Sequence, residues 1–161
     1  MSTWSEADQG RFEDPLIRLS SLAVEDIHVV CPRCDARAVD TPWPAAGPRY
    51  VTSWPRRLAC QNCAYWAVRP DGSSVWGQPV DPFFRVPLLL QAACCGGHTL
   101  WAFNETHLDL LEGYVAARLR ERRAHPASMS VLARLPAWMK SAKHREDVLR
   151  AIRRLRGSLA T

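Results

Sequence analysis

Two C-x-x-C pairs constrain this 161-residue chain more than any other feature of its sequence. Cys31 and Cys34 form the first pair, Cys60 and Cys63 form the second, and 25 residues lie between the pairs. Four thiolates brought together by two tight turns form the closed tetrahedral site that is typical of structural zinc. Redox-active thiols are the alternative, but a thioredoxin-like role requires a single C-x-x-C at the start of a helix. The sequence therefore predicts one structural Zn²⁺ and leaves no open coordination position for catalysis.

The residues around both pairs resemble a known type of metal module. Cys-Pro-Arg-Cys-Asp at 31–35 and Cys-Gln-Asn-Cys-Ala-Tyr at 60–65 resemble the knuckles of zinc ribbons of the rubredoxin and transcription-factor-IIB type. The resemblance covers about residues 24–77 and implies the fold more than any one function. Such ribbons commonly have Gly after the second cysteine, where this chain has Asp35 and Ala64. A left-handed backbone at these positions costs Ala more than Asp.

A second resemblance concerns residues 82–156, which look like part of small bacterial zinc-ribbon proteins. This resemblance implies no particular activity.

The pattern around the cysteines predicts a three-stranded ribbon. Residues 24–30 alternate as a strand that enters the first pair, and residues 50–59 return as a strand toward the second pair. Residues 40–48 contain three prolines and a glycine, so we expect a loop there. Residues 65–68 leave the second pair as a strand, and after a turn at 69–72 the chain pairs back through residues 73–76.

Beyond this ribbon, the pattern predicts a hairpin. Apolar runs at residues 88–93 and 98–103 flank two glycines, which favours a tight connection between two strands.

The remaining sequence has helical periodicity. Asn104 is a good N-cap, and apolar residues recur at steps of three and four up to Arg123. Pro136 suits the first turn of a short helix. The final helix is expected over about residues 141–156, with Val148, Ile152 and Leu155 on its buried face and Gly157 just beyond its end.

The expected fold class is therefore α+β: a zinc-ribbon β module with a second small β-hairpin, followed by C-terminal α-helices. We expect three regions: a flexible lead-in at 1–20, the zinc-ribbon/β module at 21–103 and a basic helical region at 104–161.

The charge of the chain is strongly polarised. Residues 1–115 hold nine Arg against thirteen acidic residues, a net charge of −4, whereas residues 116–161 hold twelve Arg and Lys against three acidic residues, a net charge of +9. This basic density favours phosphate binding, with a solvated face or contact with an acidic protein surface as the alternative. Trp138 lies among the cations as a stacking surface. Seven residues are the expected nucleic-acid contacts: Arg134, Lys140, Lys143, Arg145, Arg150, Arg153 and Arg154.

Other chemically reactive residues have simpler interpretations. Cys94 and Cys95 are adjacent, so their side chains point to opposite faces of a strand, and we expect core cysteines rather than ligands of one ion. A second metal, bound by one of them with His98 and His107, is the alternative. Three residues at the start of the expected helix offer a catalytic alternative, but early acids ordinarily complement the helix dipole. These three are His107, Asp109 and Glu112.

Composition excludes several other classes of protein. Apolar residues make up 47% of the chain and charged residues 23%, as in ordinary soluble domains. No apolar run approaches the ~18 residues of a membrane span, and residues 1–14 lack the apolar core of a signal peptide. Paired C-x-x-C cysteines suit a reducing compartment, so we expect a cytoplasmic protein.

These features predict a non-enzymatic, structural-zinc protein that binds nucleic acid through its Arg-rich C-terminal helices. The alternative is an interaction adaptor that docks on a larger transcription or replication assembly. The sequence indicates no membrane association and no small-molecule substrate.

Overall fold

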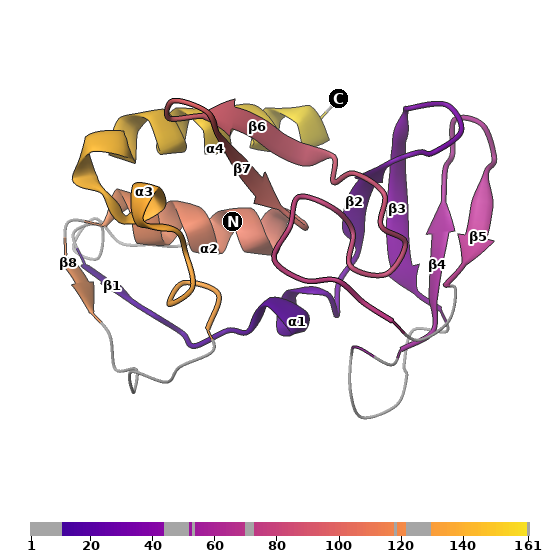
Figure 1. The fold of residues 1–161 in the computed structure, drawn as a ribbon, viewed down its shortest axis with the longest axis horizontal. Coiled ribbons are helices and arrows are strands. Elements are labelled where there is room, and N and C mark those ends of the chain that lie inside the picture. Colours follow the sequence, from indigo (N-terminus) through magenta and orange to yellow (C-terminus); the bar gives the residue numbers. More distant parts are fainter. Residues whose placement is uncertain are drawn as a thin grey trace.

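The structure is a computed structural model, and it describes residues 11–43, 52, 54–69, 73–117, 119–121 and 130–160. It confirms the α+β class, with a four-stranded antiparallel sheet, a separate hairpin and C-terminal helices. The hairpin and the two long helices are β6 (Leu90–Cys94), β7 (His98–Ala102), α2 (Glu105–Ala116) and α4 (Arg145–Leu159). Figure 1 shows the four-stranded sheet at one end of the molecule and these elements at the other. One continuous apolar cluster connects the two parts.

The four-stranded sheet presents the cysteine pairs. Its strands, in spatial order, are β2 (Ile27–Val30), β3 (Arg37–Pro42), β4 (Arg56–Ala59) and β5 (Trp66–Val68). Buried and partly exposed residues alternate along β2, β3 and β4, as expected for a sheet with one face covered. One cysteine pair connects β2 to β3 and the other connects β4 to β5. Antiparallel pairing therefore brings both pairs to the same end of the sheet.

Two predictions about this sheet are wrong. Residues 40–42, expected in a loop, are the end of β3, because Pro42 occupies the last position, where its missing N–H disturbs the ladder least. Residues 73–76 form no strand, because the Val75 N–H donates to the carbonyl of Pro82 at 2.9 Å instead. Most of the turn expected at 69–72 lies outside the described residues, and β4 occupies only the last part of the strand expected at 50–59.

The predicted hairpin is confirmed. Strands β6 and β7 pair in antiparallel register, and the connection has positive φ at Cys95, Gly96 and Gly97. The chain that leads into β6 runs along the free edge of β2, where the Val30 N–H donates to Pro87 O at 2.9 Å and the Leu89 N–H donates to His28 O at 3.0 Å. The hairpin is thus attached directly to the four-stranded sheet.

Helix α2 begins as predicted but ends early. The Asn104 side chain accepts a hydrogen bond from the His107 N–H at 3.0 Å, which confirms the N-cap. The predicted extension to Arg123 is wrong, because the helix ends at Ala116 and β8 (Leu119–Glu121) follows. Strand β8 pairs in parallel with β1 (Arg11–Glu13), a partner more than a hundred residues away in the sequence. Residues 122–129 lie outside the described residues.

Part of the expected lead-in is built into the fold. Within residues 11–20 lie β1 and the start of the short helix α1 (Leu19–Leu22). The Phe12 ring lies against α2, where a Cβ added at Gly113 would be 2.9 Å from it. Asp14 accepts a hydrogen bond from the Ser130 hydroxyl at 2.7 Å, which ties this segment to the C-terminal region.

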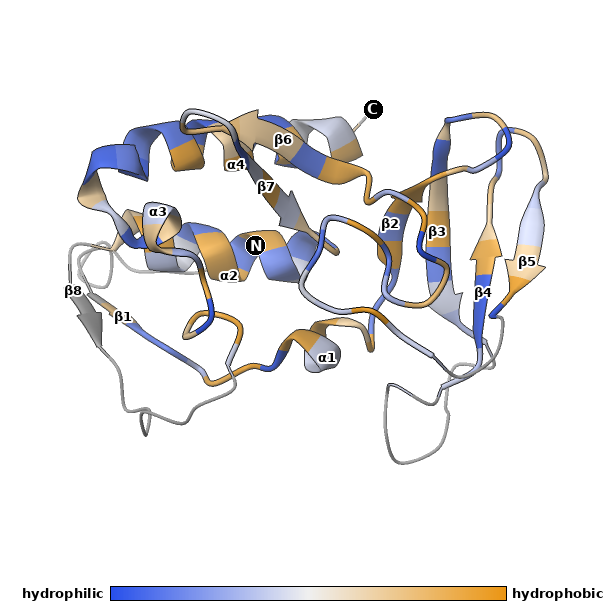
Figure 2. Ribbon diagram, in the orientation of Figure 1, coloured by the Kyte–Doolittle hydropathy of each residue, from blue (hydrophilic) through white to orange (hydrophobic). Residues whose placement is uncertain are grey.

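The C-terminal region contains α3 (Ala137–Lys140), a 3-10 turn (Ala142–His144) and α4. The predicted buried face of α4 is confirmed, with Ala151 in addition to the three expected residues. Figure 2 shows this division, with hydrophobic positions interrupting a largely hydrophilic helix. The helix continues past Gly157 to Leu159. Among the described residues, no helix has the length and apolar character needed to cross a bilayer.

Candidate metal centre and cationic helix

The four predicted ligand cysteines lie together at one end of the sheet. Their Sγ atoms are all within 4.8 Å of one another. The Cys31–Cys63 and Cys34–Cys60 Sγ distances are both 3.6 Å. A tetrahedral site with Zn–S bonds of about 2.3 Å has S···S distances of roughly 3.8 Å. The donor set and its geometry therefore fit one closed, tetrahedral zinc site.

The two turns that carry these cysteines have the same local structure. The Cys31 N–H donates to Ala36 O and the Cys60 N–H donates to Tyr65 O, both at 2.8 Å. The residue after the second cysteine has a left-handed backbone in each turn, with φ of 60° at Asp35 and 61° at Ala64. This conformation is the one that the resemblance to zinc-ribbon knuckles implies. Ala64 adopts it without the freedom of a glycine.

Hydrogen bonds to the sulfurs favour thiolates at this site. The Arg33 N–H donates to Cys31 Sγ, and the Asn62 Nδ2 group donates to Cys34 Sγ, both at 3.4 Å. The Asn62 amide and then the Ala36 N–H lower the pKa of Cys34 to about 6. Such donors supply the outer shell that fixes thiolate ligands around a metal.

The pKa of Cys63 is shifted in the opposite direction, upward. The Tyr65 N–H lowers its pKa, but burial and hydrogen bonds with the other three sulfurs outweigh this effect and raise the pKa to about 12. The charge of one thiolate thus opposes ionisation of its neighbour. A divalent cation removes this conflict by neutralising both charges.

The predicted nucleic-acid contacts fall into two groups. Arg150, Arg153 and Arg154 are exposed on α4, opposite its buried face, and Lys143 is exposed just before the helix. Arg150 also pairs with Asp147 at 3.1 Å, but both side chains are more than half exposed, so solvent screens this pair. The structure thus brings four of the seven predicted residues together at α4.

The other three predicted contacts have separate surroundings. Lys140 donates to Ala133 O at 3.1 Å, and Arg145 donates to Ala117 O at 3.4 Å. Both groups therefore help to hold the C-terminal segments in place. Arg134 is exposed and lines a cavity.

One cation near α4 was missed by sequence reasoning. Arg37, the first residue of β3, donates to Leu159 O at the end of α4, at 3.0 Å. Arg33, also exposed, lies in the adjacent turn and stacks over Tyr65 of the other turn, 5.1 Å from its centroid. Arg33 lies within the first cysteine pair and Arg37 follows it, which was a signal, but the net negative charge of residues 1–115 obscured it.

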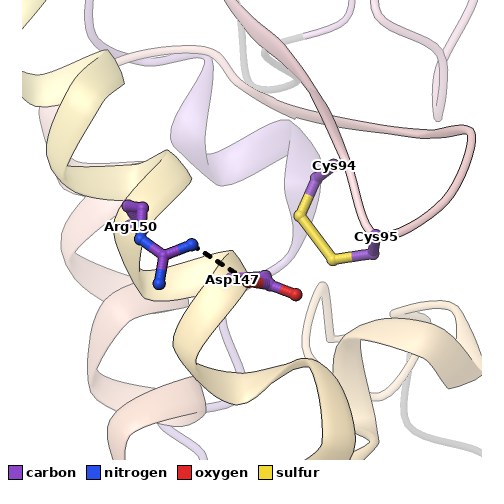
Figure 3. The surroundings of a disulfide bond; sticks show 4 residues. All are labelled: Cys94, Cys95, Asp147 and Arg150. Atoms are coloured by element: carbon purple, nitrogen blue, oxygen red, sulfur yellow. Dashed lines mark hydrogen bonds and ion pairs between the residues drawn. A yellow bond between two sulfur atoms is a disulfide. The ribbon is translucent and has the colours of Figure 1, made fainter.

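A second group of metal-ligating residues occurs at the hairpin connection. Cys94 and Cys95 are joined by a disulfide, so the expectation that their side chains point to opposite faces of a strand is wrong: β6 ends at Cys94, and Cys95 lies in the turn. Ligand atoms of Cys95, His144 and Asp147 lie within 4.8 Å of one another, but a disulfide sulfur is not a thiolate ligand. Figure 3 shows Asp147 beside this disulfide, with its ion pair to Arg150.

The histidines considered in the sequence are not part of that group. His98 stacks on Trp138 with ring centroids 4.8 Å apart, and His107 is buried beside Trp101 and Phe103. Asp109 and Glu112 turn outward, away from the buried His107, and pair with Arg156 at 2.7 and 3.4 Å. The possible catalytic residues at the start of α2 therefore do not converge on one site.

Comparison with protein-family models, curated proteins and solved structures found no match to this chain. The metal assignment accordingly depends on the four cysteines, whose arrangement at the ends of antiparallel strands is consistent with a zinc ribbon.

Proposed function

We propose that this chain is a non-enzymatic, structural-zinc protein that binds nucleic acid through an α4 cationic face, made up of Lys143, Arg150, Arg153 and Arg154. The observation that carries this proposal is the division of α4 into two faces. One face holds the four buried residues, and Arg150, Arg153 and Arg154 are exposed on the opposite face. No carboxylate in the described part of the chain pairs with Arg153 or Arg154, so both guanidinium groups are free to bind phosphate.

The zinc module has a defined part in this proposal. Arg37 links β3 to the end of α4, so the metal-stapled turns and the helix belong to one surface. Arg33 and Arg37 are further exposed cations beside the metal centre. Zinc orients this surface without contacting the nucleic acid.

Binding of this kind has a characteristic salt dependence. Arg and Lys that neutralise phosphates release counterions, so affinity falls steeply as salt rises. Contacts to phosphate position a protein but carry no sequence information, so we expect weak sequence preference.

The experiment is a fluorescence-anisotropy titration with single-stranded DNA, duplex DNA and RNA at several salt concentrations. Replacement of Arg150, Arg153 and Arg154 with Gln should weaken binding to all sequences alike. The slope of log affinity against log salt should become shallower by roughly 0.7–0.9 for each phosphate that the variant no longer neutralises. Unchanged far-UV circular dichroism would show that the helix is intact.

Two single substitutions provide a matched comparison. Arg153→Gln and Arg85→Gln each remove one exposed positive charge, but Arg85 lies in the β module. Only Arg153→Gln should change the salt slope. Equal effects of the two, or an unchanged slope in the triple variant, would reject the α4 cationic face.

Docking on a protein partner is the second candidate function, and one observation favours it. Strand β5 is an edge of the described sheet, and its residues Trp66 and Val68 are 63% and 62% exposed. They lie two residues apart and so point to the same side of the strand. Absence of nucleic-acid binding by the wild type at low salt would favour this adaptor role.

A further inference from the structure

A large cavity lies between the N-terminal segment, the hairpin and the C-terminal helices. Its volume is about 640 Å³, within the range of small-molecule sites. It is lined by residues of α1, β7, α2 and the segment 131–139. Three of the seven tryptophans line it, from three separate parts of the chain: Trp76, Trp101 and Trp138. Their rings offer extended flat surfaces on which a planar ligand can stack.

One buried polar group in the lining is a hydrogen-bond donor. His107 is only 2% exposed, and its Nδ1 accepts a hydrogen bond from the Phe103 N–H at 3.1 Å. A neutral imidazole that accepts at Nδ1 carries its proton on Nε2. Burial lowers the pKa of His107 to about 3, so the ring remains neutral at physiological pH.

The charged lining residues have one sign. Arg18 and Arg134 line the cavity, and no Asp or Glu is among the described lining residues. No carboxylate in the described part of the chain pairs with Arg18. Guanidinium groups beside a largely apolar cavity favour an anionic ligand, because charge-assisted hydrogen bonds to them are strong.

We propose that this cavity binds a small planar aromatic anion. The aromatic ring lies among Trp76, Trp101 and Trp138, the carboxylate, sulfonate or phosphate binds Arg18 and Arg134, and His107 donates to a ring or linker acceptor. This site is separate from the α4 cationic face, and it assigns Arg134 to a small ligand rather than to nucleic acid.

Two fluorescent probes with the same ring system test this proposal. 1-Anilinonaphthalene-8-sulfonate is an aromatic anion, and N-phenyl-1-naphthylamine is its neutral counterpart. The folded, zinc-containing protein should bind the anion saturably at one per chain and the neutral probe more weakly. Arg18→Gln should lower the affinity for the anionic probe by about tenfold. The affinity for the neutral probe should change less than twofold.

Two further variants complete the test. Thr99 is exposed and lines the cavity. Thr99→Trp should therefore block entry of both probes into the cavity and weaken their binding without disturbing the core. Arg85→Gln, outside the cavity, should affect neither. The proposal would be overturned if binding of the anionic probe did not saturate, or if Arg18→Gln lowered the affinities for both probes equally. Wild-type affinities for both probes in Thr99→Trp would also overturn it. Displacement of the anionic probe by an oligonucleotide would also overturn it, because nucleic acid would then be the occupant.

Discussion

The Arg56 Nε group donates to Asp40 Oδ1 at 2.7 Å, and both side chains are completely buried. Arg56 also donates to the carbonyl of Ala23 at 2.6 Å and stacks over the Phe83 ring, 4.5 Å from its centroid. Arg56 therefore joins the four-stranded sheet to the segments that pack against it. A buried pair of this kind is costly to break, because the remaining charge has no partner.

A second buried carboxyl group adjoins this pair. Asp81 Oδ1 accepts hydrogen bonds from the Phe83 and Phe84 N–H groups at 2.7 and 2.8 Å. The Oδ2 atoms of Asp40 and Asp81 have no hydrogen-bond partner among the described groups. Burial and then Asp81 raise the pKa of Asp40 well above its usual value, despite Arg56. The buried Asp40 carboxyl thus takes up a proton more readily than an exposed one.

Asp81→Asn should relieve the effect of the Asp81 carboxyl on Asp40. The Asn oxygen accepts from Phe83 and Phe84, and its amide donates to Asp40. In the wild type, the raised pKa of Asp40 contributes stability that is complete below about pH 4 and is lost as pH rises through the folded-state value. Urea unfolding should therefore show that Asp81→Asn is at least as stable as the wild type at pH 8.

Asp81→Ala is the control, because it leaves the Phe83 and Phe84 N–H groups without an acceptor. Asp81→Ala should lower the free energy of unfolding by about 2 kcal/mol or more. Equal destabilisation by Asn and Ala at pH 8 would contradict an effect of the Asp81 carboxyl on Asp40.

Ala64→Gly should stabilise the zinc-bound protein by up to about 1 kcal/mol, because Gly adopts a left-handed backbone without steric cost. The greater freedom of Gly in the unfolded chain offsets part of this gain. Ala38→Gly is the matched control, since Ala38 is 1% exposed within β3 and its replacement should be destabilising instead. Thermal unfolding of the zinc-saturated variants measures both effects, and destabilisation by Ala64→Gly would be inconsistent with the turn geometry.

Gly113→Ala tests the packing of β1 on α2. In an unobstructed helix this change raises the free energy of unfolding by about 1 kcal/mol. Here the new Cβ would lie 2.9 and 3.2 Å from two atoms of the Phe12 ring, so the variant should gain nothing or lose stability. The same substitution in a Phe12→Ala background should stabilise. Denaturant unfolding of the four proteins gives the coupling free energy between positions 12 and 113. If Gly113→Ala stabilised the wild type by the full amount, the Phe12 ring would not lie against Gly113.

Asn62→Leu should make zinc release occur at higher pH. The Asn62 amide is the largest cause of the lowered pKa of Cys34, so its removal raises that pKa and lets protons compete with zinc earlier. The midpoint of acid-induced release, followed with a chromogenic chelator, should rise by about 0.5 pH unit, the equivalent of one modest hydrogen bond. Gln61→Leu, at the exposed neighbouring residue, should leave the midpoint unchanged. Identical midpoints for the two variants would show that the amide does not support the thiolate.

Local signals in the sequence predicted the parts of this fold that depend on short-range chemistry. The cysteine spacing predicted the metal cluster, Asn104 predicted the start of α2, and the apolar spacing predicted the buried face of α4. Each of these features depends on residues within a few turns or on a repeated motif.

The features that were missed depend on long-range contacts. Helical periodicity continues past Ala116, but pairing with β1 gives residues 119–121 a backbone ladder that outweighs it. The contact of Arg37 with the end of α4 and the gathering of three tryptophans around one cavity likewise require segments far apart in the chain. No local pattern encodes such contacts.

Zinc content per chain tests the central claim most directly. Elemental analysis of the purified wild type should give one zinc. Cys34→Ser and Cys60→Ser should each lose zinc and the fold of the ribbon, because metal binding contributes roughly 10–16 kcal/mol of apparent folding free energy at such sites. Two zinc ions per chain would contradict a single structural site. Unchanged zinc content and thermal stability in both variants would contradict the four-cysteine centre itself.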